Sequence, residues 1–195
     1  MAAKGQEAIY SFLHVGSGPR NPKKIPVAYQ GPEWREVRLD INPEVSPDIL
    51  GDIRAMPAVE TARFDAVYSS HNLEHLYPHE APLALAEFLR VLRPGGQALV
   101  TCPDLQAVAE HVAQGNLTQP IYTSPAGPIA PLDILYGHRP SLARGNLYMA
   151  HRTGFIASTL AQAMADAGFV NITVQRRGGP YFDLWAQGQR PAGAG

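Results

Sequence analysis

The sequence predicts an α/β fold: a Rossmann-like, seven-stranded and mostly parallel sheet with an antiparallel last strand, in a three-layer α/β/α sandwich. Two observations support this expectation. Short apolar runs rich in β-branched and aromatic residues alternate with segments of helical periodicity, which is typical of parallel sheets covered by helices. A glycine turn, Gly16-Ser17-Gly18, directly follows the first run, and acidic residues follow the next two.

Seven strands are expected, most of them short and apolar. The last two are separated by Arg177-Gly178-Gly179-Pro180, a turn-forming sequence that predicts a hairpin and one antiparallel strand. The expected strands are Ala8–Val15, Glu36–Ile41, Ile49–Ile53, Phe64–Ser69, Gln97–Cys102, Val170–Gln175 and Phe182–Gln187.

Three helices are expected between the later strands. In Ala81–Leu92 apolar residues recur at helical spacing, and Arg93-Pro94-Gly95-Gly96 ends the helix. Asp104 can cap a second helix that ends near Gln114, and a third spans Ala157–Ala167. The early crossovers are rich in proline and poor in helical signal, so we expect one face of the sheet to be thinly covered.

We expect a single domain over residues 1–195, because the length and a hydrophobic content of 45% suit one globular core. The proline-rich segment 116–152 is too long for an inert loop in a small domain, and it is expected to be a lid or an acceptor-binding insertion. Residues 188–195 are expected to form a flexible tail.

Charge and cysteine content also limit the classes of binding partner and the cellular compartment that we expect. A formal net charge of −1, without a basic patch, argues against binding to nucleic acid or to a membrane surface. The single cysteine, Cys102, cannot form an intramolecular disulfide, which fits a reducing compartment. With no leader-like or membrane-spanning segment in the sequence, we expect a cytoplasmic protein.

The residues after the strands predict an adenosine pocket, because ligands of open parallel sheets bind beyond the carboxyl ends of the strands. Gly16-Ser17-Gly18 allow a tight turn and a close approach to a ligand. Asp40 can accept both hydroxyls of a ribose, Asp52 can accept an exocyclic amine, and Ile53 can cover a purine ring. Asn21 stands where a dinucleotide-binding turn would have its third glycine.

At this point the sequence resembles the class I S-adenosylmethionine-dependent methyltransferases, specifically the small bacterial methyltransferase-11-like type with a GSGPR turn. The match extends over nearly the whole chain, and the stretch RVLRPGG before a strand is its most specific part. The segments that carry the resemblance are LHVGSGPR, VRLDI, LGDIRAMP, FDAVYSSHNLEHL, FLRVLRPGGQALVTCPDL and HRTGFIASTLAQAMADAGF.

The resemblance implies S-adenosyl-L-methionine as cofactor. The glycine turn would lie under its methionine part, with Asp40 on the ribose, Asp52 and Ile53 at the adenine, and Ser69, Ser70 and His71 on the open side. The cofactor-binding residues implied are therefore Gly16, Ser17, Gly18, Asp40, Ile41, Asp52, Ile53, Ser69 and Ser70.

His71 is the candidate catalytic residue. It follows the strand whose end is nearest the expected methyl group, and a histidine with an ordinary pKa can remove a proton from an acceptor near neutral pH. A residue that only lines the pocket is the other interpretation, and it stays open.

The segment His71-Asn72-Leu73-Glu74-His75 also has the H-x-x-E-H spacing of some zinc peptidases. That motif needs both histidines on one helix, whereas His71 directly follows a strand-like run, Pro78 interrupts any longer helix, and no third acidic ligand is identifiable. We therefore expect no metal site, and interpret Glu74 and His75 as residues that begin a short helix.

The sequence thus predicts methyl transfer from S-adenosylmethionine to an unidentified small-molecule acceptor. Two alternatives remain: a module that binds S-adenosylmethionine without transfer activity, and a zinc-dependent hydrolase that uses the HNLEH segment. The expected partner is the small-molecule acceptor, with no nucleic acid and no membrane, and a homodimer is left open.

Overall fold

The computed structural model describes residues 9–179 and 181–193, so the predicted positions Ala8, Pro180 and 194–195 lie outside it. A seven-stranded sheet in the order β3-β2-β1-β4-β5-β9-β8 forms the body. Its strands are β1 (Tyr10–Val15), β2 (Trp34–Asp40), β3 (Ile49–Leu50), β4 (Phe64–Ser70), β5 (Leu92–Pro103), β8 (Val170–Arg177) and β9 (Asp183–Gln189).

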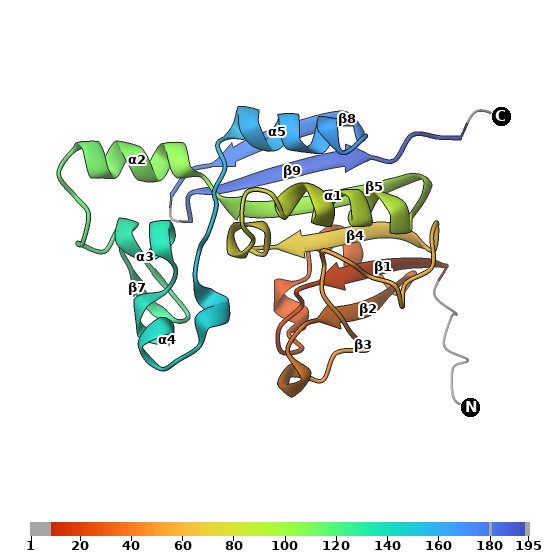
Figure 1. Ribbon diagram of the computed structural model, residues 1–195, viewed down its shortest axis with the longest axis horizontal. Coiled ribbons are helices and arrows are strands. Elements are labelled where there is room, and N and C mark those ends of the chain that lie inside the picture. Colours follow the sequence, from red (N-terminus) through yellow and green to blue (C-terminus); the bar gives the residue numbers. More distant parts are fainter. Residues whose placement is uncertain (1–8, 180, 194–195) are drawn as a thin grey trace.

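The predicted topology is confirmed. The pairs β1–β2, β1–β4, β2–β3 and β4–β5 are parallel, and β9 is antiparallel to both β5 and β8. In Figure 1 the arrowheads of β1 and β4 point in one direction, whereas β9 runs the opposite way. The carboxyl ends of the parallel strands therefore meet at one edge of the sheet.

The prediction of a flexible tail from residue 188 is wrong for its first residues. Gly188 and Gln189 pair with Ala98 and Gln97 of β5. The Arg190 guanidinium donates to the carbonyl oxygens of Arg90 (2.9 Å) and Leu92 (2.6 Å), where α1 (Ala81–Val91) ends. A cation at a helix carboxyl terminus is favourable, so this contact holds the last strand against α1.

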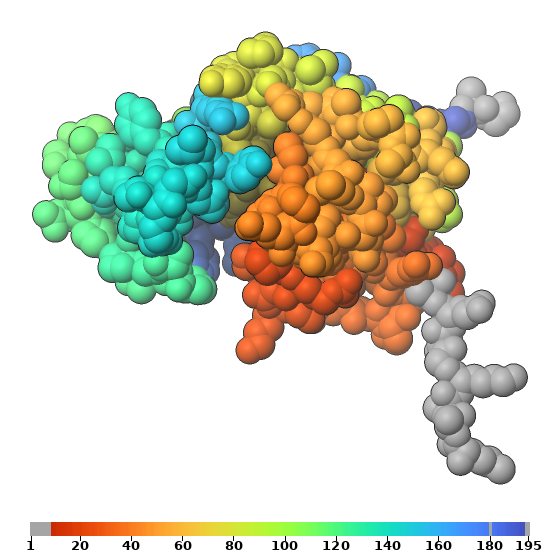
Figure 2. All heavy atoms as spheres, turned by 60° about the horizontal axis from the view of Figure 1, so that its bottom comes forward, coloured from red at the N-terminus to blue at the C-terminus, as the bar shows by residue number. Residues whose placement is uncertain are grey.

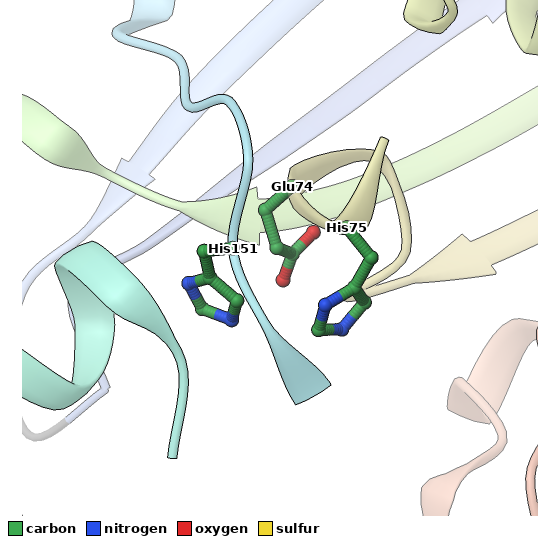
Figure 3. Close-up of side chains that lie close together, drawn as sticks. All are labelled: Glu74, His75 and His151. Atoms are coloured by element: carbon green, nitrogen blue, oxygen red, sulfur yellow. The ribbon is translucent and has the colours of Figure 1, made fainter. Parts of the chain in front are cut away.

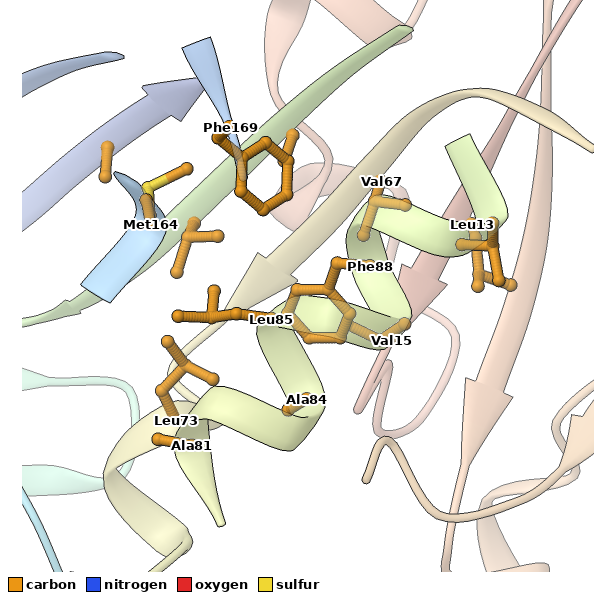
Figure 4. Close-up of a cluster of buried hydrophobic side chains, with 14 of the residues drawn as sticks. Leu13, Val15, Val67, Leu73, Ala81, Ala84, Leu85, Phe88, Met164 and Phe169 are labelled. Atoms are coloured by element: carbon orange, nitrogen blue, oxygen red, sulfur yellow. The ribbon is translucent and has the colours of Figure 1, made fainter. Parts of the chain in front are cut away.

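One face of the sheet is covered by α1 and α5 (Ala157–Asp166), both predicted from apolar spacing. Leu85 and Phe88 of α1 are fully buried, because residues three or four apart lie on one side of a helix. Figure 4 shows Phe88 beside Val67 of β4, with Met164 of α5 and Phe169 further along the same layer. This layer is the main hydrophobic core.

The other face is thinly covered, as expected. Its buried residues include Phe12 and Tyr68, and the chain that packs on them forms the short 3₁₀ helices Pro22–Lys24 and Val27–Tyr29. Tyr29 stacks on Phe12 with ring centroids 5.0 Å apart. The prolines of this segment prevent a long α-helix, so aromatic rings replace the second helical layer.

Segment 116–152 belongs to a small unit at the carboxyl edge of the sheet (Figure 1). The unit has its own hydrophobic cluster of Val108, Ile129 and Ile134, which joins α2 (Leu105–Ala113), the two-stranded sheet β6 (Tyr122–Ser124) and β7 (Gly127–Ile129), and α3 (Pro131–Tyr136). The helix α4 (Arg139–Ala143) and the 3₁₀ helix Leu147–Met149 complete it. In the described part of the chain, no helix is long and apolar enough to cross a lipid bilayer.

The core assignment leads to a prediction for α1. Phe88→Ala should lower the free energy of unfolding by about 3–5 kcal/mol, because it leaves a cavity between α1 and the sheet. Leu83 lies on the same helix but is 52% exposed, so Leu83→Ala is the matched control and should change stability by less than about 0.5 kcal/mol. Urea unfolding measures both, and equal losses in the two variants would contradict the packing described.

Candidate active site

The glycine turn after β1 has the backbone geometry that its residues predict. Gly16 and Gly18 have φ angles of +55° and +58°, in the left-handed region that glycine adopts without strain. A side chain at Gly16 would overlap the Asn72 carboxamide. At Gly18 no described heavy atom lies within 4 Å of where a Cβ would stand, so the backbone here is open to a ligand.

Asp40 ends β2 beside this turn and is buried. One carboxylate oxygen accepts from the Gly18 amide at 2.7 Å and the other from the Asn42 amide at 2.9 Å. A carboxylate oxygen has more than one acceptor position, so both can still accept from ligand hydroxyls. The structure therefore brings the predicted turn and the predicted ribose acid together, with Asp40 also fixing the turn.

Arg38, which the sequence analysis missed, holds the same turn from within β2. It is 2% exposed, and its guanidinium donates to the carbonyl oxygens of Gly18, Val45 (3.0 Å) and Ser46 (2.9 Å). Its position two residues before Asp40 could have indicated this, since alternate residues of a strand lie on the same face of the sheet and Arg38 therefore points to the same side as Asp40. An ion buried in this way stiffens the loops on both sides of Asp40.

Asp52 and Ile53 follow β3 and are less free to act as predicted. Both Asp52 oxygens accept from the Arg54 Nε, at 3.0 and 2.9 Å, and Arg54 also contacts Glu80. These hydrogen bonds lower the pKa of Asp52, although partial burial opposes the shift. Ile53 packs against the main core, whereas Ile41, next to Asp40, is 47% exposed and is available to contact an aromatic ring.

Ser69 and Ser70 end β4 and tie it to its neighbours. Asn72 Nδ2 donates to the Val15 carbonyl at 2.9 Å and to the Ser69 hydroxyl at 3.3 Å. The Thr101 hydroxyl of β5 donates to that of Ser70 at 3.1 Å. These bonds connect the strand ends of β1, β4 and β5 in one hydrogen-bonded row.

His71 comes next, with a φ of +55° and an exposed side chain between two carboxylates. Its Nδ1 lies 3.2 Å from Glu74 Oε1, and its Nε2 lies 3.6 Å from Asp183 Oδ1. Partial burial acts to lower the pKa of His71, but hydrogen bonding and charge from Asp183 and Glu74 outweigh it and raise the pKa to about 10. The imidazole is therefore cationic at neutral pH.

A pocket of about 110 Å³ opens between these strand ends and segment 116–152. Figure 2 shows the surface hollowed between that segment, in green and cyan, and the orange residues near β3. His71 and Asp183 form the sheet side of the pocket, and aromatic, apolar and imidazole side chains form the other. The lining residues are His71, Pro103, Tyr122, Ile129, Asp133, Ile134, His138, Met149, His151, Tyr181 and Asp183.

The H-x-x-E-H segment does not form one helix. His71 precedes the 3₁₀ helix Leu73–His75 and lies at the strand end, as expected from the sequence. Glu74 is instead clamped from the far end of the insertion, since its carbonyl accepts from the amides of Arg152 (2.7 Å) and Thr153 (3.2 Å). His75 and His151 consequently lie beside Glu74.

The comparisons with known proteins agree with this architecture. The family model described as a methyltransferase domain matches residues 13–100, from β1 to the middle of β5, including the glycine turn, Asp40 and Ser69-Ser70-His71. The match covers 88 of the 195 residues, and over them the chain is similar to methyltransferase domains. The open turn beside Asp40 fits S-adenosylmethionine, the cofactor that this similarity implies.

Solved structures share the fold of this chain at low sequence identity. An N1-methyltransferase from Burkholderia thailandensis, solved with 1,6-didemethyltoxoflavin and S-adenosylhomocysteine, is 16% identical with a TM-score of 0.60 over 94% of this chain and 72% of that one. A Methanosarcina mazei S-adenosylmethionine-dependent methyltransferase is 14% identical, with a TM-score of 0.58 over 96% and 95%. A search of curated proteins found no match.

Asp133, which lines the pocket, leads to a prediction of how the stability of the protein depends on pH. It is buried, and its carboxylate accepts from the amides of Ala130 (2.9 Å) and Arg139 (3.1 Å) and from the Arg139 guanidinium. Burial opposes ionisation, but these bonds outweigh it and lower the pKa of Asp133 to about 2. A lowered pKa in the folded state means that the stabilisation is present above pH 4 and is lost as the pH falls towards 2.

Asp133→Asn should therefore destabilise the protein by about 1.5–3 kcal/mol near neutral pH, the cost of losing hydrogen bonds to a charged group. The difference from the wild type should shrink as the pH falls from 4 to 2. Urea unfolding across this range measures it. A difference that stays constant with pH would rule out the ionised carboxylate as its source.

Proposed function

We propose that this protein is an S-adenosylmethionine-dependent methyltransferase, and that it transfers the methyl group to a small-molecule acceptor bound in the pocket between the strand ends and segment 116–152. One observation carries the proposal. Asn72 lies against the glycine turn, while its neighbour His71 lines the pocket. A cofactor on the turn and an acceptor in the pocket would therefore meet at this short segment.

The proposed cofactor contacts come from three strand ends. Gly16, Ser17 and Gly18 offer an open backbone, and Asp40 offers acceptor positions for the ribose. Ile41 is exposed beside Asp40 and suits contact with the adenine ring.

The other predicted cofactor residues are proposed in more limited roles. Ser69 and Ser70 hold the end of β4 in place through their hydroxyls. Asp52 and Ile53 remain predictions for the adenine site, and Asp52 would contact a ligand while bound to Arg54.

The chemistry requires positioning more than acid–base assistance. When bound, S-adenosylmethionine supplies a methyl group activated by its sulfonium. The chain holds the strand ends in one hydrogen-bonded row, and orientation of two reactants contributes up to about 7–11 kcal/mol in favourable systems. The raised pKa of His71 favours a role in lining and orienting, since a cationic imidazole donates hydrogen bonds and does not accept a proton.

The acceptor is proposed to be small and at least partly aromatic or hydroxylated. The lining residues Tyr122, His138 and Tyr181 support this class, because aromatic rings stack on planar ligands and their hydroxyl and imidazole groups form hydrogen bonds. The Burkholderia structure holds 1,6-didemethyltoxoflavin together with S-adenosylhomocysteine, which supports a small-molecule acceptor for the shared fold. Segment 116–152 is proposed as the acceptor-binding insertion. A cytoplasmic location and a homodimer stay predictions.

Asp40→Ala tests the cofactor site. The variant should bind S-adenosylmethionine at least tenfold more weakly, because it removes the ribose acceptor and the bond that fixes Gly18. Isothermal titration calorimetry measures the affinity, and Asp166→Ala on α5 is the control because that residue is exposed and belongs to another element. Unchanged affinity in the Asp40 variant would refute the proposed cofactor site.

A further inference from the structure

We propose that Glu74, His75 and His151 form a binding site for one divalent first-row transition-metal ion, such as zinc. Figure 3 shows the Glu74 carboxylate between the two imidazole rings. One possible ligand atom from each residue lies within 4.8 Å of the other two. This proposal replaces the sequence-based expectation of no metal site, because the third ligand comes from the far end of the insertion and belongs to no local motif.

The first argument is an unpartnered buried oxygen. Glu74 is 1% exposed, and its Oε1 lies within hydrogen-bond distance of His71 Nδ1. Its Oε2 is buried and has no hydrogen-bond partner within residues 9–179 and 181–193. A buried acceptor without a partner is costly, and a bound cation would supply the missing interaction.

The second argument is the orientation of the two histidines. His75 Nδ1 lies 3.1 Å from the Ala150 carbonyl oxygen, and His151 Nδ1 lies 2.6 Å from that of Ile134. A carbonyl oxygen only accepts, so each Nδ1 carries the hydrogen and each Nε2 keeps its lone pair. Histidines that bind metals commonly have this arrangement, in which the other ring nitrogen donates to a backbone carbonyl.

The third argument is that the backbone holds the ligands in place. The amides of Arg152 and Thr153 donate to the Glu74 carbonyl, which clamps the segment bearing His151 onto the helix bearing His75. Three ligands about 2.1 Å from one zinc ion lie roughly 3.4 Å apart in tetrahedral geometry. Small side-chain rotations that move each ligand atom by up to about 1 Å would therefore complete the site.

The donor set decides the class of metal. Two imidazole nitrogens and one carboxylate oxygen suit zinc and its first-row neighbours, whereas magnesium and calcium prefer oxygen ligands throughout. Three protein ligands leave at least one coordination position open, as in catalytic zinc sites. His151 also lines the acceptor pocket, so the open position would lie at the pocket wall.

This placement suggests a substrate class, an inference that rests on the proposed function. An acceptor hydroxyl bound to the ion would have a lowered pKa and would release its proton to solvent. Its oxygen would then form the new bond to the methyl carbon while the carbon–sulfur bond of S-adenosylmethionine breaks and the sulfonium becomes a thioether. The metal would thus favour oxygen acceptors.

Metal titration tests the site without reference to activity. The full chain, free of any purification tag and treated with chelator, is titrated with zinc by calorimetry and with Co²⁺ by visible absorption. We expect one ion per chain at micromolar affinity or tighter, and a Co²⁺ spectrum with nitrogen-ligand bands. Glu74→Gln and His151→Ala should each weaken binding at least 100-fold, whereas His79→Gln, a change at an exposed histidine on the neighbouring loop, should leave it unchanged.

The outcomes are distinct. Absent binding, weak binding at several sites, or stoichiometric binding that survives both ligand changes would overturn the proposal. Circular dichroism establishes that each variant is folded, and Glu74→Gln keeps the size of the side chain. S-adenosylmethionine affinity is measured on the same samples without metal, so loss of the metal site and loss of the cofactor site are separated.

Discussion

Parallel pairing of β1 with β2 and β4 brings the carboxyl ends of three strands, at Val15, Asp40 and Ser70, to one edge of the sheet. Everything else in the candidate active site depends on this constraint. The glycine turn can be held by Asp40 and approached by Asn72 only because the strands end side by side. The fold therefore places the strand ends side by side, and hydrogen bonds between them hold the glycine turn, Asp40 and Asn72 in fixed positions.

The elements with strong local patterns were predictable from the sequence. The seven strands of the main sheet, the helices α1, α2 and α5 and the glycine turn arise from spacing and turn chemistry within short segments. The strand bounds differ most from the prediction at two ends: β5 begins at Leu92, five residues before the predicted Gln97, and β3 ends at Leu50 instead of Ile53. The pairing of Asp40 with the turn was also accessible, since parallel strands bring their carboxyl ends together. The thin face followed from prolines in one crossover.

The features that were not predictable depend on residues far apart in the chain. The sequence around Glu74 does not predict that His151 lies beside it, because the insertion between them folds as its own small unit before the chain returns to the sheet. Arg38 was missed for a related reason, since its partners Val45 and Ser46 lie at the end of a short 3₁₀ helix, Pro43–Val45, that no apolar spacing in the sequence predicts. The first tail residues were misjudged because glycine and arginine suggest mobility locally, whereas pairing with β5 and α1 orders them.

The separate hydrophobic cluster around Val108, Ile129 and Ile134 has an evolutionary consequence. Because these side chains pack mainly on one another, the unit they stabilise can be exchanged or redesigned while the strand ends beneath it stay intact. Under the proposed function, changes confined to this one stretch of the sequence would alter the acceptor while the strand ends that hold the cofactor stay the same. The backbone amides of Arg152 and Thr153 attach the returning chain to the Glu74 carbonyl, and because any residue except proline supplies such an amide, this attachment places little demand on the sequence of the insertion.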